Sequence, residues 1–557
     1  MKHTKNKLLL VLFLLLCGSQ SSSFAARHAL LVGISEYPVK PLAGPVNDVI
    51  AMKRTLAKKW HFDRRNITTL LNQQATKENI MRELNKVYGA TREGDDVFIY
   101  LSGHGTSTLD ENNIVELPPT SGAFFPVDIM GFTNKRDLAN RLIVGQKDLF
   151  PILKKFDDGL RNVFVVIDAC FSGNTVRSNK LPTRYLSTSD VLTKSAFGDD
   201  ITPIAETDLV PRPSYPYKNI FYLSAASENQ PAKDIPYSMI DRYPTIDSKP
   251  HGAFTDTLLR ILNKENVVDT NRDGKISYLE LRERVRFEMR RRGFEQTPQG
   301  LPSEKKDPLN INSRSIFGSE NNSTLETAKV INHKDNEPLG IQLDSSVQHI
   351  AQTLRKISTV KLVSSLPDIL VKRQNSKTLF VGYSGDIMHS LYRPKDSEII
   401  QILRRYARLH YLKQKNYSQE FNVELHTSSP DSGGIVVEGE KVGFSIRTDT
   451  PSYILLVNFD PSGIATVIYP DNRSELKKIK ANDEMLLKNV SRARAPFGTD
   501  YILLYAFDEL THEHELLMGK QFPIDSPLMN KLEHLVRNKN VKKAMADLEL
   551  ITVPKSN

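Results

Sequence analysis

Cysteine is scarce in this sequence: the 557 residues contain only Cys17 and Cys170, beside a single tryptophan. We expect Cys17 to lie in a segment that is removed, as argued below, which leaves one cysteine and no partner for a disulfide. A fold held together by disulfides is therefore excluded, and the presence of a single thiol at Cys170 has to be explained in another way. Long apolar runs are absent too. The run at residues 8–16 falls far short of the roughly 20 residues that span a bilayer, and no later stretch is longer.

No single charge dominates the chain. Lysine and arginine total 75, aspartate and glutamate total 65, and the formal net charge of +10 is small for this length. This balance does not call for a nucleic-acid partner. Hydrophobic residues make up 39% of the chain, which excludes a wholly disordered protein. At roughly 150 residues per domain, the length predicts three or four domains.

The N-terminus has the layout of a secretory signal peptide. Residues 1–7 carry three lysines, residues 8–16 are an unbroken apolar run, and residues 18–26 are small and mostly polar. We expect cleavage after Ala25, with an uncleaved anchor as the alternative. The mature chain would then be exported, to a periplasmic or extracellular location, without a transmembrane segment. Its unpaired cysteine favours a bacterial envelope over a eukaryotic secretory route.

Apolar strands alternate with helices in the first half of the chain, which predicts an α/β fold with a mostly parallel sheet. Strands are expected at residues 28–34, 66–71, 96–101, 163–168 and 219–224. Helices are expected at residues 47–59 and 76–88, the first with Asn47 or Asp48 as its N-cap.

Two of these strands end in glycine-rich turns that carry His104 and Cys170. Residues 102–105 read SGHG and residues 168–173 read DACFSG. Sites in parallel sheets form at the carboxyl ends of strands, so neighbouring strands would bring the imidazole and the thiol together. The histidine could then take the thiol proton, while the N–H groups of Gly105 and Cys170 receive an oxyanion. The alternative is a buried structural cysteine beside a strand-end histidine.

Five motifs in a fixed order carry a resemblance to a known family. They are HALLVGI (28–34), LAGPVND (42–48), YLSGHG (100–105), VVIDACFSG (165–173) and LSAA (223–226). Together they resemble the caspase-type cysteine peptidases, most closely the metacaspase and bacterial orthocaspase branch, over about residues 27–295. The resemblance implies a caspase-hemoglobinase fold and endopeptidase activity, with His104 as base, Cys170 as nucleophile and no cofactor for the chemistry itself.

The resemblance also places Asp48, Ser102 and Asp168 in the specificity pocket. Paired carboxylates attract a guanidinium or ammonium group and repel an acidic one, which implies protein or peptide substrates cut after arginine or lysine. From the residues alone, Asp48 could equally be a helix N-cap and Asp168 an Asx turn residue. The family usually has a cysteine where this chain has Pro45.

An enzyme with this preference could cut itself. The long segment 172–218, rich in serine, threonine and proline, falls between the two halves of the caspase-like unit. We hypothesise autoprocessing there, at one of six basic residues: Arg177, Lys180, Arg184, Lys194, Arg212 and Lys218.

Residues 269–280 (DTNRDGKISYLE) fit the calcium loop of an EF-hand at every position. The expected oxygen ligands are Asp269, Asn271, Asp273, Lys275 through its carbonyl, Ser277 and Glu280. Helices are expected on both sides, at 253–264 and 277–291. The alternative is a turn that has only the pattern, because EF-hands usually come in pairs and no second loop is found. The basic stretch 282–293 that follows is interpreted as a solvated helix face.

We divide the chain into six segments. They are a signal peptide (1–25), a caspase-like peptidase domain (26–300), a linker (301–339), a small mixed α/β unit (340–418), a β-sandwich-like domain (419–530) and a C-terminal helical tail (531–557). Residues 440–475 resemble a β-rich domain of unknown function found behind bacterial caspase-like units. Two alternatives to a peptidase therefore stay open: a catalytically minor scaffold, and a calcium-responsive envelope binding protein acting through these modules.

Overall fold

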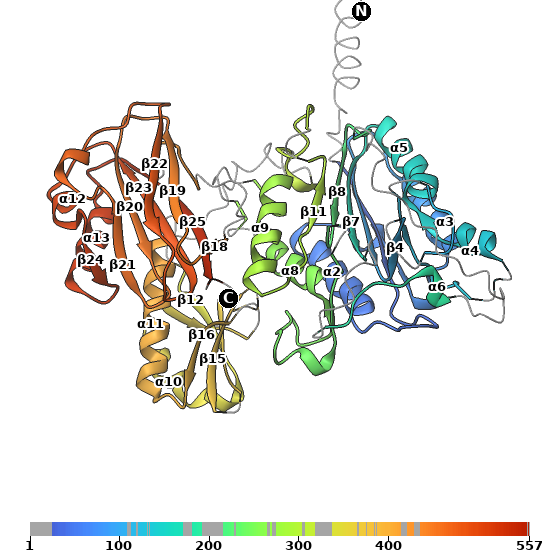
Figure 1. The fold of residues 1–557 in the computed structure, drawn as a ribbon, viewed down its shortest axis with the longest axis horizontal. Helices are drawn as coiled ribbons and strands as arrows, with labels where there is room; N and C mark the ends of the chain where they lie inside the picture. The colour runs from blue at the N-terminus through green and yellow to red at the C-terminus, as the bar shows by residue number, and fades with distance from the viewer. Residues whose placement is uncertain are drawn as a thin grey trace, which may run out of the picture.

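The computed structural model has three parts, which Figure 1 shows from the N-terminal half in blue and green to the C-terminal half in orange and red. The structure describes residues 25–108, 113–118, 121–130, 132, 134–170, 181–191, 215–227, 230–264, 268–269, 275–303, 307–317, 337–364, 367–374, 376–383, 385, 387–413, 420–427, 435–553 and 555. The proposed leader with Cys17 therefore lies outside the described residues. Among the described residues, no helix combines the length and the apolarity needed to cross a bilayer.

The first part is built on a six-stranded sheet in the order β11-β8-β7-β3-β1-β2. The strands are β1 (Arg27–Gly33), β2 (Ile67–Leu71), β3 (Asp96–Ser102), β7 (Asn162–Asp168), β8 (Ile220–Ser224) and β11 (Gln299–Leu301). All pairings are parallel except that of β11 with β8. The five strands expected from the apolar runs are thus present, and β3 and β7 are neighbours with Ser102 opposite Asp168.

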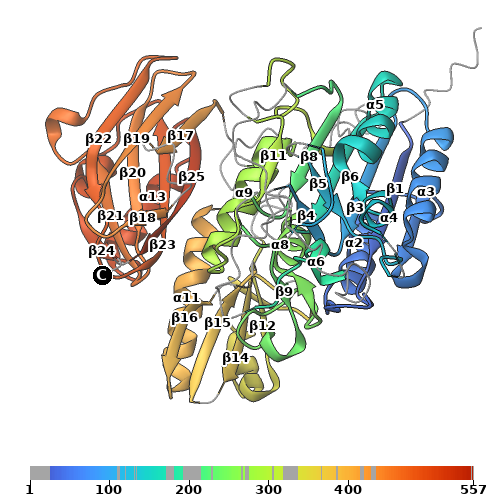
Figure 2. The same ribbon diagram turned by 45° about the vertical axis from the view of Figure 1, so that its right-hand side comes forward.

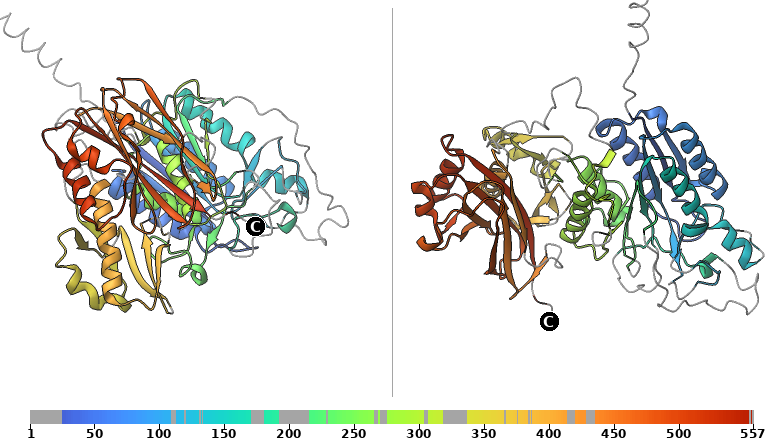
Figure 3. Two further views of the ribbon diagram at one scale, coloured as in Figure 1. Left: turned by 60° about the vertical axis from the view of Figure 1, so that its left-hand side comes forward. Right: turned by 90° about the horizontal axis from the view of Figure 1, so that it is seen from above.

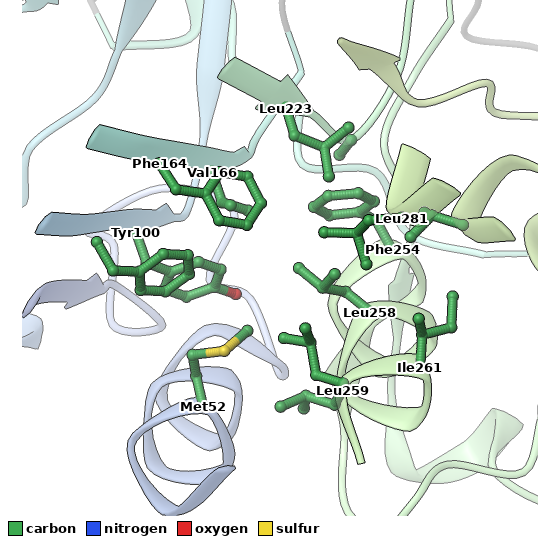
Figure 4. Packing of buried hydrophobic residues seen from close by; sticks show 14 of the residues in the cluster. Met52, Tyr100, Phe164, Val166, Leu223, Phe254, Leu258, Leu259, Ile261 and Leu281 are labelled. Carbon is green, nitrogen blue, oxygen red and sulfur yellow. The ribbon is translucent and has the colours of Figure 1, made fainter. Parts of the chain in front are cut away.

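Helices cover both faces of this sheet. On one face lie α2 (Pro45–Lys59), α8 (Ala253–Leu262) and α9 (Tyr278–Arg291), and on the other lie α3 (Lys77–Ala90) and α5 (Phe150–Asp158). Successive side chains of a strand point to opposite faces of the sheet, so alternate residues of each strand pack into the two cores. Figure 4 shows the first core, where Met52 of α2 and Leu258 of α8 pack toward Tyr100 and Phe164 of the sheet. Both faces are therefore buried, which explains the unbroken apolar runs of β3 and β7.

Short elements gather beyond the sheet. They are β4 (Gly105–Ser107), β5 (Gly122–Phe124), α4 (Lys135–Arg141), β6 (Ile143–Val144), α6 (Thr188–Val191), β9 (Asp234–Ile235) and β10 (His251–Gly252). The first part also extends past the expected boundary at residue 300. Strand β11 pairs with β8, and Ile316 and Phe317 are buried in the core of α2, α8 and α9. Of the expected linker, residues 304–306 and 318–336 lie outside the described residues.

The second part is a small α/β unit with a five-stranded sheet in the order β13-β12-β14-β15-β16. Its elements are β12 (Leu339–Leu343), α10 (Ala351–Leu354), β13 (Val360–Leu362), β14 (Ile369–Gln374), β15 (Lys377–Gly382), β16 (Ile387–Tyr392) and α11 (Asp396–Lys413). Helix α11 connects it to the third part. Leu403 packs in the core of the small unit, whereas Leu409 and Leu412 pack against the next sheet.

The third part is a β-sandwich of a three-stranded sheet, β17-β19-β22, and a six-stranded sheet, β18-β25-β23-β20-β21-β24 (Figure 2). The strands are β17 (Val423–Thr427), β18 (Ile435–Val437), β19 (Lys441–Thr448), β20 (Tyr453–Phe459), β21 (Ile464–Tyr469), β22 (Glu484–Arg492), β23 (Gly498–Phe507), β24 (Gln521–Pro523) and β25 (Lys543–Val553). Helices α12 (His512–Leu517) and α13 (Pro527–Arg537) cover the outer face of the larger sheet. The expected helical tail is wrong beyond α13, because residues 543–553 form β25 between β18 and β23.

Helix α9 lies between the first sheet and the C-terminal modules, as Figure 1 and the right-hand view of Figure 3 show. Arg284 and Arg291 of α9 bond to Glu549 of β25, and Arg284 also bonds to the hydroxyl of Tyr383 in the small unit. Both arginine side chains are nearly buried. The expectation of a solvated basic face on 282–293 is therefore wrong, because acidic partners from a distant part of the chain cover it.

Candidate active site

Register brings His104 and Cys170 to the same edge of the sheet. Ser102, the last residue of β3, pairs with Asp168, the last residue of β7, and each candidate follows two residues later. Both side chains are buried. The Cys170 Sγ accepts a hydrogen bond from the N–H of Ala232 at 2.9 Å. Burial raises the pKa of the Cys170 thiol to about 12, so in this state the sulfur keeps its proton at neutral pH.

Hydrogen bonds orient the imidazole of His104. Its Nε2 lies 2.6 Å from the carbonyl oxygen of Lys40, which can only accept, so Nε2 carries the proton. Among the described residues no hydrogen-bond partner reaches Nδ1, which is left with its lone pair. The Tyr37 hydroxyl accepts the backbone N–H of His104 at 3.0 Å, and the two rings are 4.7 Å apart. Burial lowers the pKa of His104 to about 4, so the ring is neutral and can act as a base.

The segment Leu181–Leu186 runs directly through this site. Arg184 donates its backbone N–H to the carbonyl of Ala232 at 2.9 Å, and Asp234 donates its own to the carbonyl of Pro182 at 2.9 Å. Thr183 and Lys233 form the antiparallel bridge between these bonds. The segment is therefore bound as an added strand, a recurring mode of binding an extended peptide through its backbone.

The carbonyl oxygen of Arg184 lies where an oxyanion would form. It accepts the N–H of Gly105 at 3.2 Å and the N–H of Cys170 at 3.3 Å. These are the two donors expected from the sequence. The backbone of Arg184 also lies close enough to the His104 ring to affect its pKa. Because Cys170 donates its own backbone N–H to this oxygen, the bond between Arg184 and Tyr185 lies beside the candidate nucleophile.

The guanidinium of Arg184 fills a buried cluster that we call the acidic cluster: Asp48, Asp168, Asp234 and the Ser102 hydroxyl. Nη2 lies 2.7 Å from Asp48 and 2.8 Å from Asp234. Nη1 donates to Ser102 at 2.6 Å and lies 3.0 Å from Asp168. All four of these side chains are almost fully buried. The three residues expected in the specificity pocket therefore come together around one cation.

Asp48 is positioned by helix α2, though not as its N-cap. The helix begins at Pro45 after Gly44, and Asp48 lies one turn inside it, so the N-cap interpretation is wrong. Its Oδ1 lies 2.8 Å from Nδ1 of His251, and its Oδ2 accepts from Ser102 and Arg184. Although burial raises the pKa of Asp48, Arg184 and His251 lower it overall, so the carboxylate is ionised.

Asp168 has a different environment in the same cluster. Burial raises its pKa to about 6, against the opposing effect of Arg184, and the charge of Asp48 adds to the rise. Its Oδ2 accepts the hydroxyl and the N–H of Thr255 at 2.5 and 3.2 Å. Those contacts reach into helix α8, so the Asx-turn interpretation does not describe this residue. Asp168 is therefore closer than Asp48 to changing its charge near neutral pH.

Sequence reasoning missed Asp234 and His251. Asp234 stands after the strand 219–224, and a residue that follows the carboxyl end of a neighbouring parallel strand belongs to the same edge, which could have singled it out. His251 carried no such signal, because the bonds to Asp48 and Asp247 that hold it depend on the folded chain. Of the six proposed cut sites, Arg184 lies in the site, Lys218 lies next to β8, and the other four are outside the described residues.

The candidate calcium loop is described in part. Asn271 and Asp273 lie outside the described residues, whereas Asp269, Lys275, Ser277 and Glu280 lie within them. Ser277 is the N-cap of α9 and forms a capping box with Glu280, whose Oε2 accepts the Ser277 N–H at 2.9 Å. Helices α8 and α9 flank the loop as expected. Among the described residues, no group of three or more His, Cys, Asp or Glu side chains is placed to hold a metal ion.

Comparison with known proteins gives the family. The family model described as the caspase domain matches residues 26–307, half of the chain. Metacaspase-7 of Arabidopsis thaliana is 29% identical over 162 residues, which cover 28% of this chain and 37% of the relative. Metacaspase-3 of Trypanosoma cruzi is 26% identical over 297 residues, covering 52% and 73%. A solved protein of Geobacter sulfurreducens is 23% identical with a TM-score of 0.35, covering 52% and 98%. The chain spans about a third of the length of several curated relatives.

Proposed function

The chain belongs to the caspase-domain family, and from this membership and the site geometry we propose that it is a cysteine endopeptidase that cuts after arginine or lysine. His104 serves as the base, Cys170 as the nucleophile, and the acidic cluster as the specificity pocket. The match with a caspase domain and with metacaspases supports the predicted fold and a cysteine-type peptidase. The cleavage preference rests on the residues of this chain.

One observation carries the proposal: Arg184 lies in the site as a substrate residue would. Its guanidinium is held by the acidic cluster, and its carbonyl oxygen accepts two backbone N–H groups. An aspartate or glutamate in the same place would bring a fourth carboxylate into a buried group of three, which costs several kcal/mol. A basic residue before the cut bond is therefore favoured on charge alone.

The chemistry follows from the same contacts. The Cys170 sulfur attacks the carbonyl carbon of Arg184 and gives its proton to Nδ1 of His104, while the N–H groups of Gly105 and Cys170 stabilise the oxyanion. Collapse breaks the bond to Tyr185, and the protonated His104 supplies the amine with its proton. Water then hydrolyses the thioester and frees the Arg184 carboxylate. Because the thiol and the imidazole are both neutral in this state, the proton moves as the sulfur attacks.

We propose that this bond is also the site of autoprocessing. While Arg184 fills the acidic cluster, no other basic side chain can enter it. The segment after the bond is anchored independently: Leu186 and Thr188 are fully buried, and Thr188 donates to Asn113 at 2.8 Å. Cleavage therefore frees the residues before the bond, while those after it stay packed. The intact chain is inactive toward other proteins in this proposal.

Two further parts of the proposal concern setting and regulation. The basic, apolar and small-residue segments at the N-terminus support export to a bacterial periplasm or the exterior. The complete ligand pattern of residues 269–280 supports calcium binding in the loop before α9. A calcium effect would appear as a higher melting temperature of a Cys170→Ala chain with calcium than with chelator. The same melting temperature in both would contradict it.

Hydrolysis of fluorogenic peptides tests the proposed activity. Peptides ending in arginine, lysine or aspartate are offered to the wild-type chain and to Cys170→Ala, with calcium and with chelator. We expect release after arginine or lysine by the wild type only. Release after aspartate alone would overturn the assignment of the acidic cluster, and no release by processed protein would overturn the peptidase.

A further inference from the structure

Asp234 is a third carboxylate around the guanidinium, and it approaches from a different direction than the other two. It lies in β9, which pairs with β10, and its backbone is part of the strand-like pairing with the Arg184 segment. Its Oδ2 accepts the N–H groups of Ala43 and Gly44 at 2.8 and 3.2 Å. These bonds fix the carboxylate so that Oδ1 faces Arg184.

Asp234 is bonded to the part of arginine that lysine lacks. Its Oδ1 lies 3.3 Å from Nε and 2.8 Å from Nη2 of Arg184, which is a bifurcated contact along one edge of the guanidinium. Asp48 and Asp168 contact only the terminal nitrogens. A lysine ends at the position of the arginine Cζ, has no Nε–H and offers one point charge in place of a planar fork.

Two glycines also lie beside the guanidinium, at positions where a larger residue would meet it. A Cβ added to Gly44 would lie 2.7 Å from Nη2 of Arg184, and one added to Gly252 would lie 2.6 Å from its Cζ. Neither glycine has a positive φ, so the backbone conformation does not require glycine at these positions. The lack of room for a side chain does. A side chain at either glycine would therefore occupy the space of the guanidinium.

We propose that Asp234 is the residue that selects arginine over lysine before the cut bond. The inference rests on the proposed peptidase and deepens it. Asp48 and Asp168 supply charge, which either basic side chain satisfies. Asp234 supplies an acceptor for Nε, which only arginine satisfies. A hydrogen bond between charged groups of this kind corresponds to about a 10- to 100-fold preference.

The test compares kcat/KM for two peptides, Leu-Pro-Thr-Arg and Leu-Pro-Thr-Lys with the same fluorogenic leaving group, whose sequence copies residues 181–184. We use processed wild type, Asp234→Asn and the control Asp241→Asn, whose carboxylate is 82% exposed and pairs with Lys372. The asparagine can still accept from Ala43 and Gly44. We expect the arginine-to-lysine ratio to exceed about tenfold in the wild type and in the control, and to fall about 10- to 100-fold in Asp234→Asn, mainly through KM.

The outcomes separate the two proposals. If the processed wild type hydrolyses neither peptide, the proposed peptidase activity and this inference are both wrong. If the peptides are hydrolysed and Asp234→Asn leaves the arginine-to-lysine ratio of kcat/KM unchanged, only the inference about Asp234 is wrong. Should Asp234→Asn melt early, self-cleavage of the full chain gives a second readout: Arg184→Lys is expected to slow it strongly in the wild-type background and weakly in the Asp234→Asn background. Equal slowing in both backgrounds would also overturn the role of Asp234.

Discussion

At the scale of single residues, the acidic cluster is a set of carboxylates with unequal roles. Asp48 is ionised because Arg184 and the cationic His251 compensate its burial. Asp168 is less well compensated, and burial raises its pKa to about 6. His104 stays neutral in the occupied site down to about pH 4. Binding of a basic side chain and the base chemistry should therefore respond to pH separately.

The first prediction follows for KM. The pKa of about 6 for Asp168 belongs to the site that holds Arg184, whose charge lowers it, so in the empty processed site this pKa lies above 6. As pH falls from 8 toward about 6, protonation of the empty site weakens binding, so KM for an arginine peptide should rise and then level off below about 6, while kcat holds to about pH 5. Steady-state kinetics of the processed enzyme between pH 5 and 8 measure both. Asp168→Asn should show a high KM that is flat over this range. A fall in kcat with constant KM would contradict the assignment.

His251 gives a second prediction, this time for stability. Its pKa is lowered by burial but raised more strongly by Asp247 and Asp48, to about 10, against an unfolded value of about 6.5. Its stabilising contribution is therefore fully present below pH 6.5 and is lost as pH rises from 6.5 through 10. Calorimetry on Cys170→Ala should show His251→Gln melting well below it at pH 6 and much closer to it at pH 10. A gap that stays constant would rule out a protonated His251.

At the scale of elements, the strands were predictable because each is an apolar run whose period and length are local properties. The five parallel strands and helices α2 and α3 lie within a few residues of their expected positions. The strand β25 was not predictable in the same way. Residues 543–553 alternate weakly, and their partners β18 and β23 lie over 35 residues away, so pairing and not local pattern decides their conformation.

The residues of the site likewise divide into those that local sequence predicts and those that only the fold brings into place. His104, Cys170, Asp48 and Asp168 stand next to strands or helices with clear patterns, and register then brings them together. Arg184 lies in a long segment without periodicity, where six basic residues looked alike. Its place is set by three-dimensional contacts with β9 and the acidic cluster. Local sequence therefore indicated where a self-cleavage site would lie, and only the fold selects the residue.

The third prediction concerns the junction of β10 and α8. Gly252 has no room for a side chain, because an added Cβ would lie 2.2 Å from Asp168 and 2.6 Å from Arg184. Gly252→Ala should displace the guanidinium and slow arginine-peptide hydrolysis by about 100-fold. Gly89→Ala in α3 makes a matched control, since its added Cβ meets nothing within 4 Å. Normal activity of Gly252→Ala would mean that substrate arginine binds elsewhere.

At the scale of the whole molecule, ion pairs of helix α9 connect the C-terminal modules to the peptidase part. Glu549 of β25 lies 2.6 Å from Lys413 of α11 and 3.1 Å from Arg291 of α9. Although burial raises its pKa, these cations and Arg284 lower it below the usual range, so Glu549 is a buried anion shared by two modules. Helix α9 begins at the candidate calcium loop, which places that loop one helix away from the junction.

A fourth prediction tests this fastening. Glu549→Gln removes the anion that Arg284, Arg291 and Lys413 share, although Glu288 still pairs with both arginines and Asp547 with Lys413. The loss should cost about 1–3 kcal/mol of unfolding free energy where the modules meet. Calorimetry and limited proteolysis of Cys170→Ala should then show the C-terminal modules melting earlier and being cut away sooner. Glu509→Gln, an exposed glutamate of the same domain, is the control. Equal behaviour of the two variants would show that the ion cluster does not hold the modules.

The position of self-cleavage tests the central claim most directly. Purified wild-type chain and Cys170→Ala are incubated with calcium, and intact mass and N-terminal sequencing identify the fragments. The account predicts one early cut in the wild type, a new N-terminus at Tyr185, and an uncut Cys170→Ala chain. A first cut after any other residue, or the same cut in Cys170→Ala, would contradict it.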